Sequence, residues 1–179
     1  DTDHSSRGHA PCSPSQFPSR HLCEGWLPEP DGGKIHPVTA EGTRCHEAME
    51  TGDDSQLESS WEETYVGYCR DYVENELRPA EVKIIEPMLE IAGGRSWGYA
   101  DLLHLDLEEE PVLAQLVDWK FGWNRIAQAS VNMQGIGYAL GVFEKYPSLR
   151  AVEVHLVMPR LGYVTTHVFT RDGDFDRMW

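Results

Sequence analysis

The sequence predicts an α/β or α+β domain built around one central sheet. Hydrophobic residues recur about every 3.6 positions over residues 57–77, which is typical of a helix with one buried face. The period changes to two in four later segments, which indicates strands: residues 97–107, 112–119, 151–158 and 163–169. A helical stretch at 127–143 separates the two groups of strands. We therefore expect helices packed against a single sheet.

The N-terminal part of the chain is predicted to be an arm followed by helices. Residues 1–13 are rich in Ser, His, Gly and Pro, so we expect a flexible arm there and a single domain over residues 14–179. Ser13 followed by Pro14 is typical of a helix start, and it predicts a short helix that runs toward Cys23. A further helix is expected over residues 39–49.

The remaining connections contain the usual turn residues. A strand is expected around Val82 and Ile84, and it could extend to Leu89, although Pro87 cannot donate a backbone hydrogen bond to a neighbouring strand. Residues 159–162 form a hairpin-type link between the last two strands.

Composition excludes several classes of protein. The chain has 179 residues, of which 40% are hydrophobic and 25% charged, as in ordinary globular domains. No segment approaches the roughly 20 apolar residues of a membrane-spanning helix, and no segment has the pattern of a secretion signal. The four cysteines contain no C-x-x-C pair, which argues against a zinc ribbon or a thioredoxin-type site. We expect reduced thiols and a cytoplasmic protein.

The negative charge is concentrated in two segments. The net charge is −15, which by itself disfavours binding to a polyanion. Residues 41–76 hold 11 acidic and 2 basic residues, and residues 106–110 add four acidic ones. The rest of the chain has a net charge of only −2, with 13 basic and 15 acidic residues. A basic groove therefore remains compatible with the sequence.

Two aspartates and a lysine form the most informative pattern. If the strands at 97–107 and 112–119 pair as a symmetric hairpin, Asp101 lies opposite Asp118 on the same face. Two such carboxylates repel each other unless they share a proton or a cation. A hard divalent ion such as Mg²⁺ prefers carboxylate oxygens. Lys120 points to the same face as Asp118, because the two residues are separated by one position on a strand.

A simpler alternative exists for these three residues. Asp101 and Asp118 could cap strand ends, and Lys120 could be a surface ion-pair partner. For any one of them this alternative is the stronger interpretation, whereas the three together, flanked by apolar strand residues, favour a site.

The motifs around these residues resemble those of the PD-(D/E)xK nuclease superfamily. Asp101 and Asp118-Trp119-Lys120 match its two acidic motifs, although Ala100 stands where the family name has Pro. Gln134-Gly-Ile-Gly-Tyr138 resembles the Q-x-x-x-Y motif of the RecB-like branch, and Gly42-Thr-Arg-Cys-His46-Glu47 resembles its G-x-x-x-H-E helix. Further segments, Ser13–Phe17 with Cys23, Asn132 with Ala139, and Pro159–Leu161, resemble phage-encoded RecB-like exonucleases.

The resemblance implies a restriction-endonuclease-like fold, with a mixed central sheet flanked by helices, and it implies a role for each matching residue. A metal, Mg²⁺ or Mn²⁺, would be held by His46, Asp101, Asp118 and the backbone carbonyl of Trp119. Glu86 or Glu90 would join a second metal or hold its waters, and the sequence does not decide between them. Lys120 would act on the attacking water. Gln134 and Tyr138 share one helix face and would support the catalytic strand and approach the substrate phosphate.

Other residues near the motifs have two interpretations each. His46-Glu47-Ala-Met-Glu50 approaches the zinc-protease motif H-E-x-x-H, but Glu50 replaces the second histidine. Trp97, Trp119 and Trp123 could stack on a base or belong to the core. Arg95, Arg125, Lys145 and Arg160 could contact a DNA backbone or be solvated charges. No cysteine follows Cys69, which excludes the iron–sulfur variant of this branch.

We therefore expect a metal-dependent DNA nuclease, with exonuclease action in phage recombination or repair ahead of structure-specific or nonspecific endonuclease action. A catalytically inactive DNA-binding module of the same fold is the alternative from another class, and an acidic DNA mimic is a third. The expected partners are DNA, a single-strand annealing protein and further copies of the chain, in the cytoplasm of a bacterial host if a phage encodes it. The sequence leaves open the polarity of digestion, the strandedness of the substrate, the oligomeric state and the number of metals.

Overall fold

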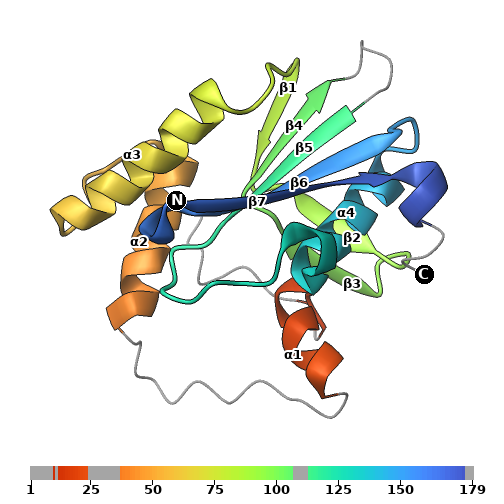
Figure 1. Cartoon of the computed structure of the whole chain (residues 1–179), viewed down its shortest axis with the longest axis horizontal. Coiled ribbons are helices and arrows are strands. Elements are labelled where there is room, and N and C mark those ends of the chain that lie inside the picture. Colours follow the sequence, from red (N-terminus) through yellow and green to blue (C-terminus); the bar gives the residue numbers. More distant parts are fainter. Residues whose placement is uncertain (1–9, 11, 24–36, 107–112, 176–179) are drawn as a thin grey trace.

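The fold is an α/β arrangement in which a mixed five-stranded sheet is flanked by helices, as Figure 1 shows. It was obtained as a computed structural model that describes residues 10, 12–23, 37–106 and 113–175. The order of the strands in the large sheet is β1-β4-β5-β6-β7, and β2 pairs with β3 in a separate two-stranded sheet. Only β5 and β6 are parallel, and the other neighbours are antiparallel. The predicted α/β class, with a mixed central sheet flanked by helices, is confirmed.

The N-terminal helices include one with a complete capping box. The short helix η2 (Pro14–Gln16) and α1 (Phe17–Leu22) lie where the Ser13–Pro14 signal predicted a helix start. After α2 (Pro37–Thr51), a capping box begins α3 (Ser60–Asn75): the Glu62 amide donates to the Ser59 side chain, and the Ser59 amide donates to the Glu62 carboxylate.

The later helix begins further along the chain than predicted. Residues 127–143 were expected to form one helix, but the structure has a short turn, η3 (Ala129–Val131), and then α4 (Met133–Lys145). The reason is Asn132, whose extended backbone and side-chain oxygen, 2.9 Å from the Gly135 amide, make it the N-cap of α4.

Two of the predicted strands are each divided between the two sheets. The strand expected near residues 82–89 is β1 (Val82–Ile85) followed by β2 (Met88–Ile91), because Glu86 has a left-handed φ of 47° and Pro87 follows it. The strand expected at 97–107 is β3 (Ser96–Tyr99) and β4 (Leu102–Asp106). The remaining strands lie close to their predicted positions: β5 (Leu113–Trp119), β6 (Ala151–Met158) and β7 (Tyr163–Thr170).

The link between β6 and β7 is a hairpin connection, as predicted. It contains one short helical turn, η4 (Pro159–Leu161), and ends at Gly162, whose φ of 54° is left-handed. The chain continues beyond β7 into one further helical turn, η5 (Arg171–Phe175). Strands β6 and β7 then pair along their whole lengths.

Each face of the large sheet has its own hydrophobic core. One cluster joins the sheet to α4 and β2 through residues such as Leu89, Leu116 and Phe143. The other joins it to α2 and α3 through residues such as Val66, Val117 and Trp119. Figure 1 shows α2 and α3 together on one side of the molecule and α4 with β2 and β3 on the other. The large sheet is therefore packed against α4 on one face and against α2 and α3 on the other.

The segment before the first helix is described only in part. Most of the predicted arm, residues 1–9 and 11, lies outside the described residues, whereas Ala10 and Ser13 are buried and Ser96 Oγ donates to the Cys12 carbonyl. Within the described part of the chain, no helix is long and apolar enough to cross a membrane.

Candidate functional site

The two aspartates lie side by side at one end of the large sheet. The predicted register is confirmed, because Leu102 of β4 pairs with Val117 of β5, and Leu103 pairs with Leu116. One step further along this register places Asp101, which directly precedes β4, opposite Asp118. This is the carboxyl end of β5 and of its parallel neighbour β6, the usual position for ligands at parallel strands.

Asp101 is held by partners from two elements. Its Oδ1 lies 3.1 Å from Nδ1 of His46, which α2 brings to the site, and its Oδ2 accepts a hydrogen bond of 2.5 Å from the Trp119 amide. Burial opposes ionisation of Asp101, but His46, Lys120 and the Trp119 amide outweigh it and hold its pKa below the usual range. Asp101 therefore carries a negative charge near neutral pH.

His46 is positioned by a ring contact as well as by Asp101. Its imidazole meets the ring of Phe121 edge to face, with centroids 4.9 Å apart. Burial disfavours the imidazolium, but the charge of Asp101 and the hydrogen bond to it raise the pKa of His46 above its usual value. The imidazole is thus oriented toward Asp101 and is about one third exposed.

Asp118 has a different environment, although it is the same type of residue. Its Oδ2 lies 2.5 Å from Nζ of Lys120. Burial raises its pKa, and the charge of Asp101 adds to this effect, against the opposing influence of Lys120. The two aspartates are therefore close enough to repel each other, as the sequence predicted.

Gln134 and Tyr138 of α4 complete a hydrogen-bonded chain. Gln134 Oε1 accepts from Lys120 Nζ at 2.9 Å, and Gln134 Nε2 donates to Asp118 Oδ1 at 3.4 Å and to Tyr138 Oη at 3.3 Å. Tyr138 Oη in turn donates to the Tyr99 carbonyl at 2.6 Å. Burial, then the charge of Asp118, raises the pKa of Tyr138, so its hydroxyl remains a donor. These hydrogen bonds link α4 to β3 and to the end of β5.

A small pocket opens beside the aspartates. Its cavity volume is about 30 Å³, enough for a water or a small ion. Its polar wall includes His46 and Asp101, and Glu86, whose amide donates to the Asp101 carbonyl at 3.0 Å. The full lining is His46, Met49, Glu50, Val73, Lys83, Ile85, Glu86, Asp101, Leu102 and Trp119.

The pocket distinguishes Glu86 from Glu90, which the sequence left as alternatives. Glu86 lies in it, whereas Glu90 of β2 lines a different pocket with Met88, Glu144 and Lys145. The sequence did not predict that Glu50 and Lys83 belong to the site, but both line the pocket. A signal for Glu50 existed, because it lies four residues after His46 and therefore on the same helix face. Lys83 had no such signal, because its position depends on the pairing of β1 with β4.

The polar groups at this site are a candidate metal-binding set. Among the described residues, no three His, Cys, Asp or Glu side chains are already grouped so as to hold a metal ion. Asp101 instead contacts His46, and Asp118 contacts Lys120. The chemistry of the donors nevertheless fits a divalent ion, because two mutually repelling carboxylates lie next to an imidazole. In addition, the buried Asp118 Oδ2 lies outside hydrogen-bond geometry despite its short contact with Lys120.

The tryptophans and arginines near the motifs prove to differ in their environments. Trp119 is a core residue with 2% exposure, whereas Trp123 is 60% exposed. Arg160 is neither a solvated charge nor a free phosphate ligand, because its side chain is 4% exposed and lies 2.7 Å from Glu41. Lys145 donates to the Met88 carbonyl, and Arg125 lies over the ring of Tyr163.

Comparisons with known proteins add little to this geometry. No protein-family profile matches the chain, and no curated protein matches it. Among solved structures, a crystal structure of SSO0001 is similar at a TM-score of 0.31 and 13% identity, over 92% of this chain and 79% of that one. At that TM-score the similarity carries no argument, so the function must be argued from the site.

Proposed function

We propose that the protein is a divalent-metal-dependent nuclease that hydrolyses phosphodiester bonds in DNA, with exonuclease action ahead of endonuclease action. The observation that supports this proposal is the convergence of six side chains, from four separate segments of the sequence, at one end of the sheet. They are His46, Asp101, Asp118, Lys120, Gln134 and Tyr138, which are the residues that carry the PD-(D/E)xK resemblance in the sequence, and contacts within the site link them.

The metal-holding groups would be the His46 imidazole, the carboxylates of Asp101 and Asp118, and the carbonyl of Trp119, with Glu86 close enough to assist from the pocket. A bound Mg²⁺ or Mn²⁺ supplies Lewis acidity toward the phosphoryl oxygens and favours deprotonation of the attacking water. The lowered pKa of Asp101 keeps one carboxylate ionised for this purpose.

The remaining groups of the site act on the water and on the phosphate. The Lys120 ammonium orients the attacking water and stabilises the negative charge that develops on the phosphoryl oxygens. Gln134 Oε1 holds that ammonium, and Gln134 Nε2 orients Asp118. In the reaction a bond forms from the water oxygen to phosphorus, the bond from phosphorus to one sugar oxygen breaks, and that oxygen receives a proton.

Incubation of the purified protein with linear and with covalently closed circular duplex DNA tests the proposal. We expect progressive loss of the linear DNA with Mg²⁺ or Mn²⁺, no loss in excess EDTA, and survival of the circle. Mn²⁺ should support turnover at least as well as Mg²⁺, because a nitrogen ligand suits it better. Cleavage of the circle would make the enzyme an endonuclease. Binding of DNA without cleavage in any metal would support the inactive-module alternative and refute the proposal.

A further inference from the structure

Two tryptophans are exposed on the wall of a second pocket, which we call the aromatic pocket. It is lined by Glu41, Trp61, Tyr65, Trp123 and Arg160. Trp61 of α3 is 66% exposed, and Trp123, in the segment after β5, is 60% exposed. The pocket has about 560 Å³ of open space, ample for a planar ring system. Large indole rings that are exposed around one pocket indicate a surface that binds a ligand or a macromolecule.

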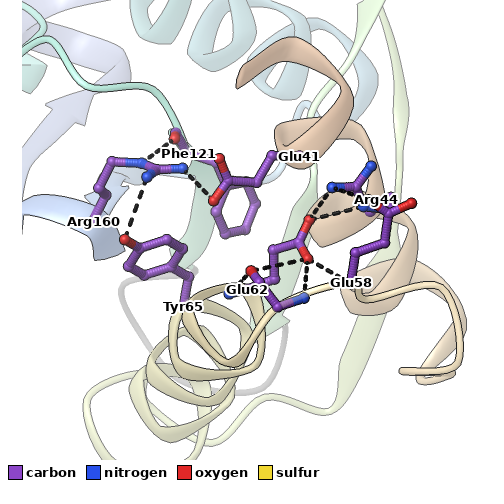
Figure 2. A network of polar contacts seen from close by, with 8 residues as sticks. Glu41, Arg44, Glu58, Glu62, Tyr65, Phe121 and Arg160 are labelled. Carbon is purple, nitrogen blue, oxygen red and sulfur yellow. Dashed lines mark hydrogen bonds and ion pairs between the residues drawn. The ribbon is translucent and has the colours of Figure 1, made fainter. Parts of the chain in front are cut away.

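Arg160 is tied to several neighbours on one side of this pocket, and Figure 2 shows its contacts with Glu41, Phe121 and Tyr65. Its guanidinium lies 2.7 Å from Glu41 Oε1 and donates to the Phe121 carbonyl at 3.0 Å and to Tyr65 Oη at 3.3 Å. The same group lies over the ring of Trp123, 4.1 Å from its centroid, and over that of Tyr65 at 4.6 Å. A side chain with these contacts and 4% exposure keeps little freedom, so the Trp123 ring rests on a fixed support.

The charges of the aromatic pocket favour binding of an uncharged ring over binding of a phosphate. Among the described residues that line it, Glu41 and Arg160 are the charged ones, and they neutralise each other through their ion pair. Glu58, which precedes the N-cap of α3, and Glu63 in the first turn of α3 lie close by in sequence and repel a phosphate. A neutral pocket with exposed indole faces favours stacking of an uncharged planar group, and nucleobases stack on such faces largely without regard to sequence.

The aromatic pocket is connected to the candidate catalytic site by shared elements. Phe121 gives its carbonyl to Arg160, and its ring contacts His46. Glu41 and His46 lie five residues apart on α2, which corresponds to about 7.5 Å along the helix axis. A DNA strand bound at the aspartates would therefore pass close to the aromatic pocket.

We propose that the aromatic pocket receives an unpaired base of a DNA strand whose phosphate is bound at the candidate catalytic site. This inference rests on the proposed nuclease function and adds the class of substrate, DNA with a single-stranded segment. Trp123 supplies the preorganised stacking face, and Trp61 lines the pocket from α3. Arg160 acts as a positioning residue for Trp123 and does not contact the DNA phosphate.

Binding of a fluorescent thymidine oligonucleotide of about 12 nucleotides, measured by anisotropy in EDTA, tests this proposal without cleavage. Trp123→Leu keeps an apolar side chain but removes the ring, and it should weaken binding about tenfold or more, whereas Trp123→Phe should recover part of the loss. Trp61→Ala, at an exposed helix position, should also weaken binding. Val168→Ala, an exposed apolar position on β7, is the matched control and should leave affinity unchanged.

Two further readouts identify the contact as stacking. An abasic oligonucleotide of the same length should bind the parent protein more weakly, and Trp123→Leu should not weaken that binding further. The dependence of affinity on salt should keep its slope in Trp123→Leu, because no phosphate contact is lost. Equal affinity of Trp123→Leu and the parent, or equal binding of the abasic and thymidine strands, would overturn the proposal.

The outcomes separate this inference from the proposed function. If the metal-dependent cleavage test fails while binding still depends on Trp123 and on the base, the base-binding pocket stands and the nuclease proposal falls. If cleavage occurs but binding is indifferent to Trp123, the pocket proposal alone is overturned. A parent protein that does not bind the thymidine strand also overturns it, and it leaves a partner of another kind for these rings.

Discussion

Asp101 and Asp118 show how two identical residues acquire different properties from their neighbours. The pKa of Asp101 is lowered by His46, Lys120 and the Trp119 amide against the effect of burial, while burial and the charge of Asp101 raise the pKa of Asp118. Such divergence between adjacent carboxyl groups is characteristic of sites that assign them different roles. Here it means that the surroundings favour the ionised form of Asp101, while burial and the charge of Asp101 disfavour ionisation of Asp118.

Tyr138 offers a prediction at the residue scale. Tyr138→Phe keeps the buried ring but removes the donor to the Tyr99 carbonyl, 2.6 Å away, and leaves that carbonyl without it. We expect the free energy of unfolding in urea to fall by about 1–3 kcal/mol. Tyr163→Phe, a half-buried tyrosine on β7, is the control and should change it by less. A Tyr138→Phe protein as stable as the parent would show that the hydroxyl does not tie α4 to β3.

The sequence allowed the prediction of most of this site, because its residues lie on regular elements with recognisable periods. The opposition of Asp101 and Asp118 followed from hairpin symmetry alone. The contact between Lys120 and Gln134 could not be predicted, because it depends on how α4 packs across the end of β5. The ion pair of Arg160 with Glu41 could not be predicted either, because the two residues are 119 positions apart in the sequence. The sequence suggested an exposed arginine, whereas the side chain of Arg160 is buried.

At the scale of elements, α4 carries small residues where other elements approach it closely. A Cβ atom on Gly141 would lie 2.9 Å from Cβ of Leu89 and 3.1 Å from the Glu90 carbonyl oxygen, both on β2. A Cβ atom on Gly137 would lie 2.6 Å from the ring of Phe17 on α1. The glycines of this helix therefore serve close packing, and the helix that carries Gln134 is held directly against β2 and α1.

A glycine substitution tests that packing. Gly141→Ala should destabilise the protein by about 1–3 kcal/mol in urea denaturation, because the backbone of β2 cannot move aside as a side chain can. Gly67→Ala in α3, where a Cβ atom would meet nothing within 4 Å, is the matched control. It should stabilise the protein by about 0.4–1 kcal/mol, because alanine has the higher helix propensity. A stabilising Gly141→Ala would contradict the close approach of β2.

Element boundaries were harder to predict than element types. The periods of residues 97–107 identified strand correctly, but they could not reveal that Ala100 and Asp101 divide it between two sheets. The left-handed backbone at Glu86 was equally hidden, since glutamate is not a residue that favours it. Both breaks serve the site, because they turn the chain where Glu86 and Asp101 meet through a backbone hydrogen bond.

At the scale of the whole molecule, stability should depend on two buried histidines. His104 of β4 and His155 of β6 are 8% and 4% exposed, and His155 Nδ1 lies 2.8 Å from Tyr72 Oη. Burial lowers the pKa of both below the usual value, and at His155 it outweighs the nearby Glu153. Folding therefore keeps both rings neutral at a pH where the unfolded chain begins to protonate them.

The sign of the resulting pH dependence follows from proton uptake. Unfolded imidazoles titrate near pH 6.5, so below about that pH the unfolded state binds more protons than the folded state, and stability falls as the pH decreases. His46, whose pKa is raised, affects stability only above that range. Urea midpoints compared across pH for the parent and for the double variant His104→Gln, His155→Gln should show a flatter profile below pH 6.5 in the variant. An unchanged profile would contradict the assignment.

The fold class was predictable at this scale, and the division of the core was not. Alternating periods identified a sheet with helices, but the separate β2–β3 sheet and the order of strands depend on contacts between distant segments. Net charge was equally uninformative about the aromatic pocket, since its ion pair and exposed indoles become neighbours only through folding.

The central claim is that Lys120 acts in the reaction while Asp101 helps to hold the metal, and one pair of variants tests it most directly. Cleavage rates and calorimetric Mn²⁺ titration are measured for Lys120→Ala and Asp101→Asn. Asp101→Asn removes a negative charge, so metal affinity and rate should fall together. Lys120→Ala removes a positive charge beside Asp118, so metal affinity should hold or rise while the rate falls by about 10²–10⁴. Cleavage by Lys120→Ala at close to the parental rate would contradict the account.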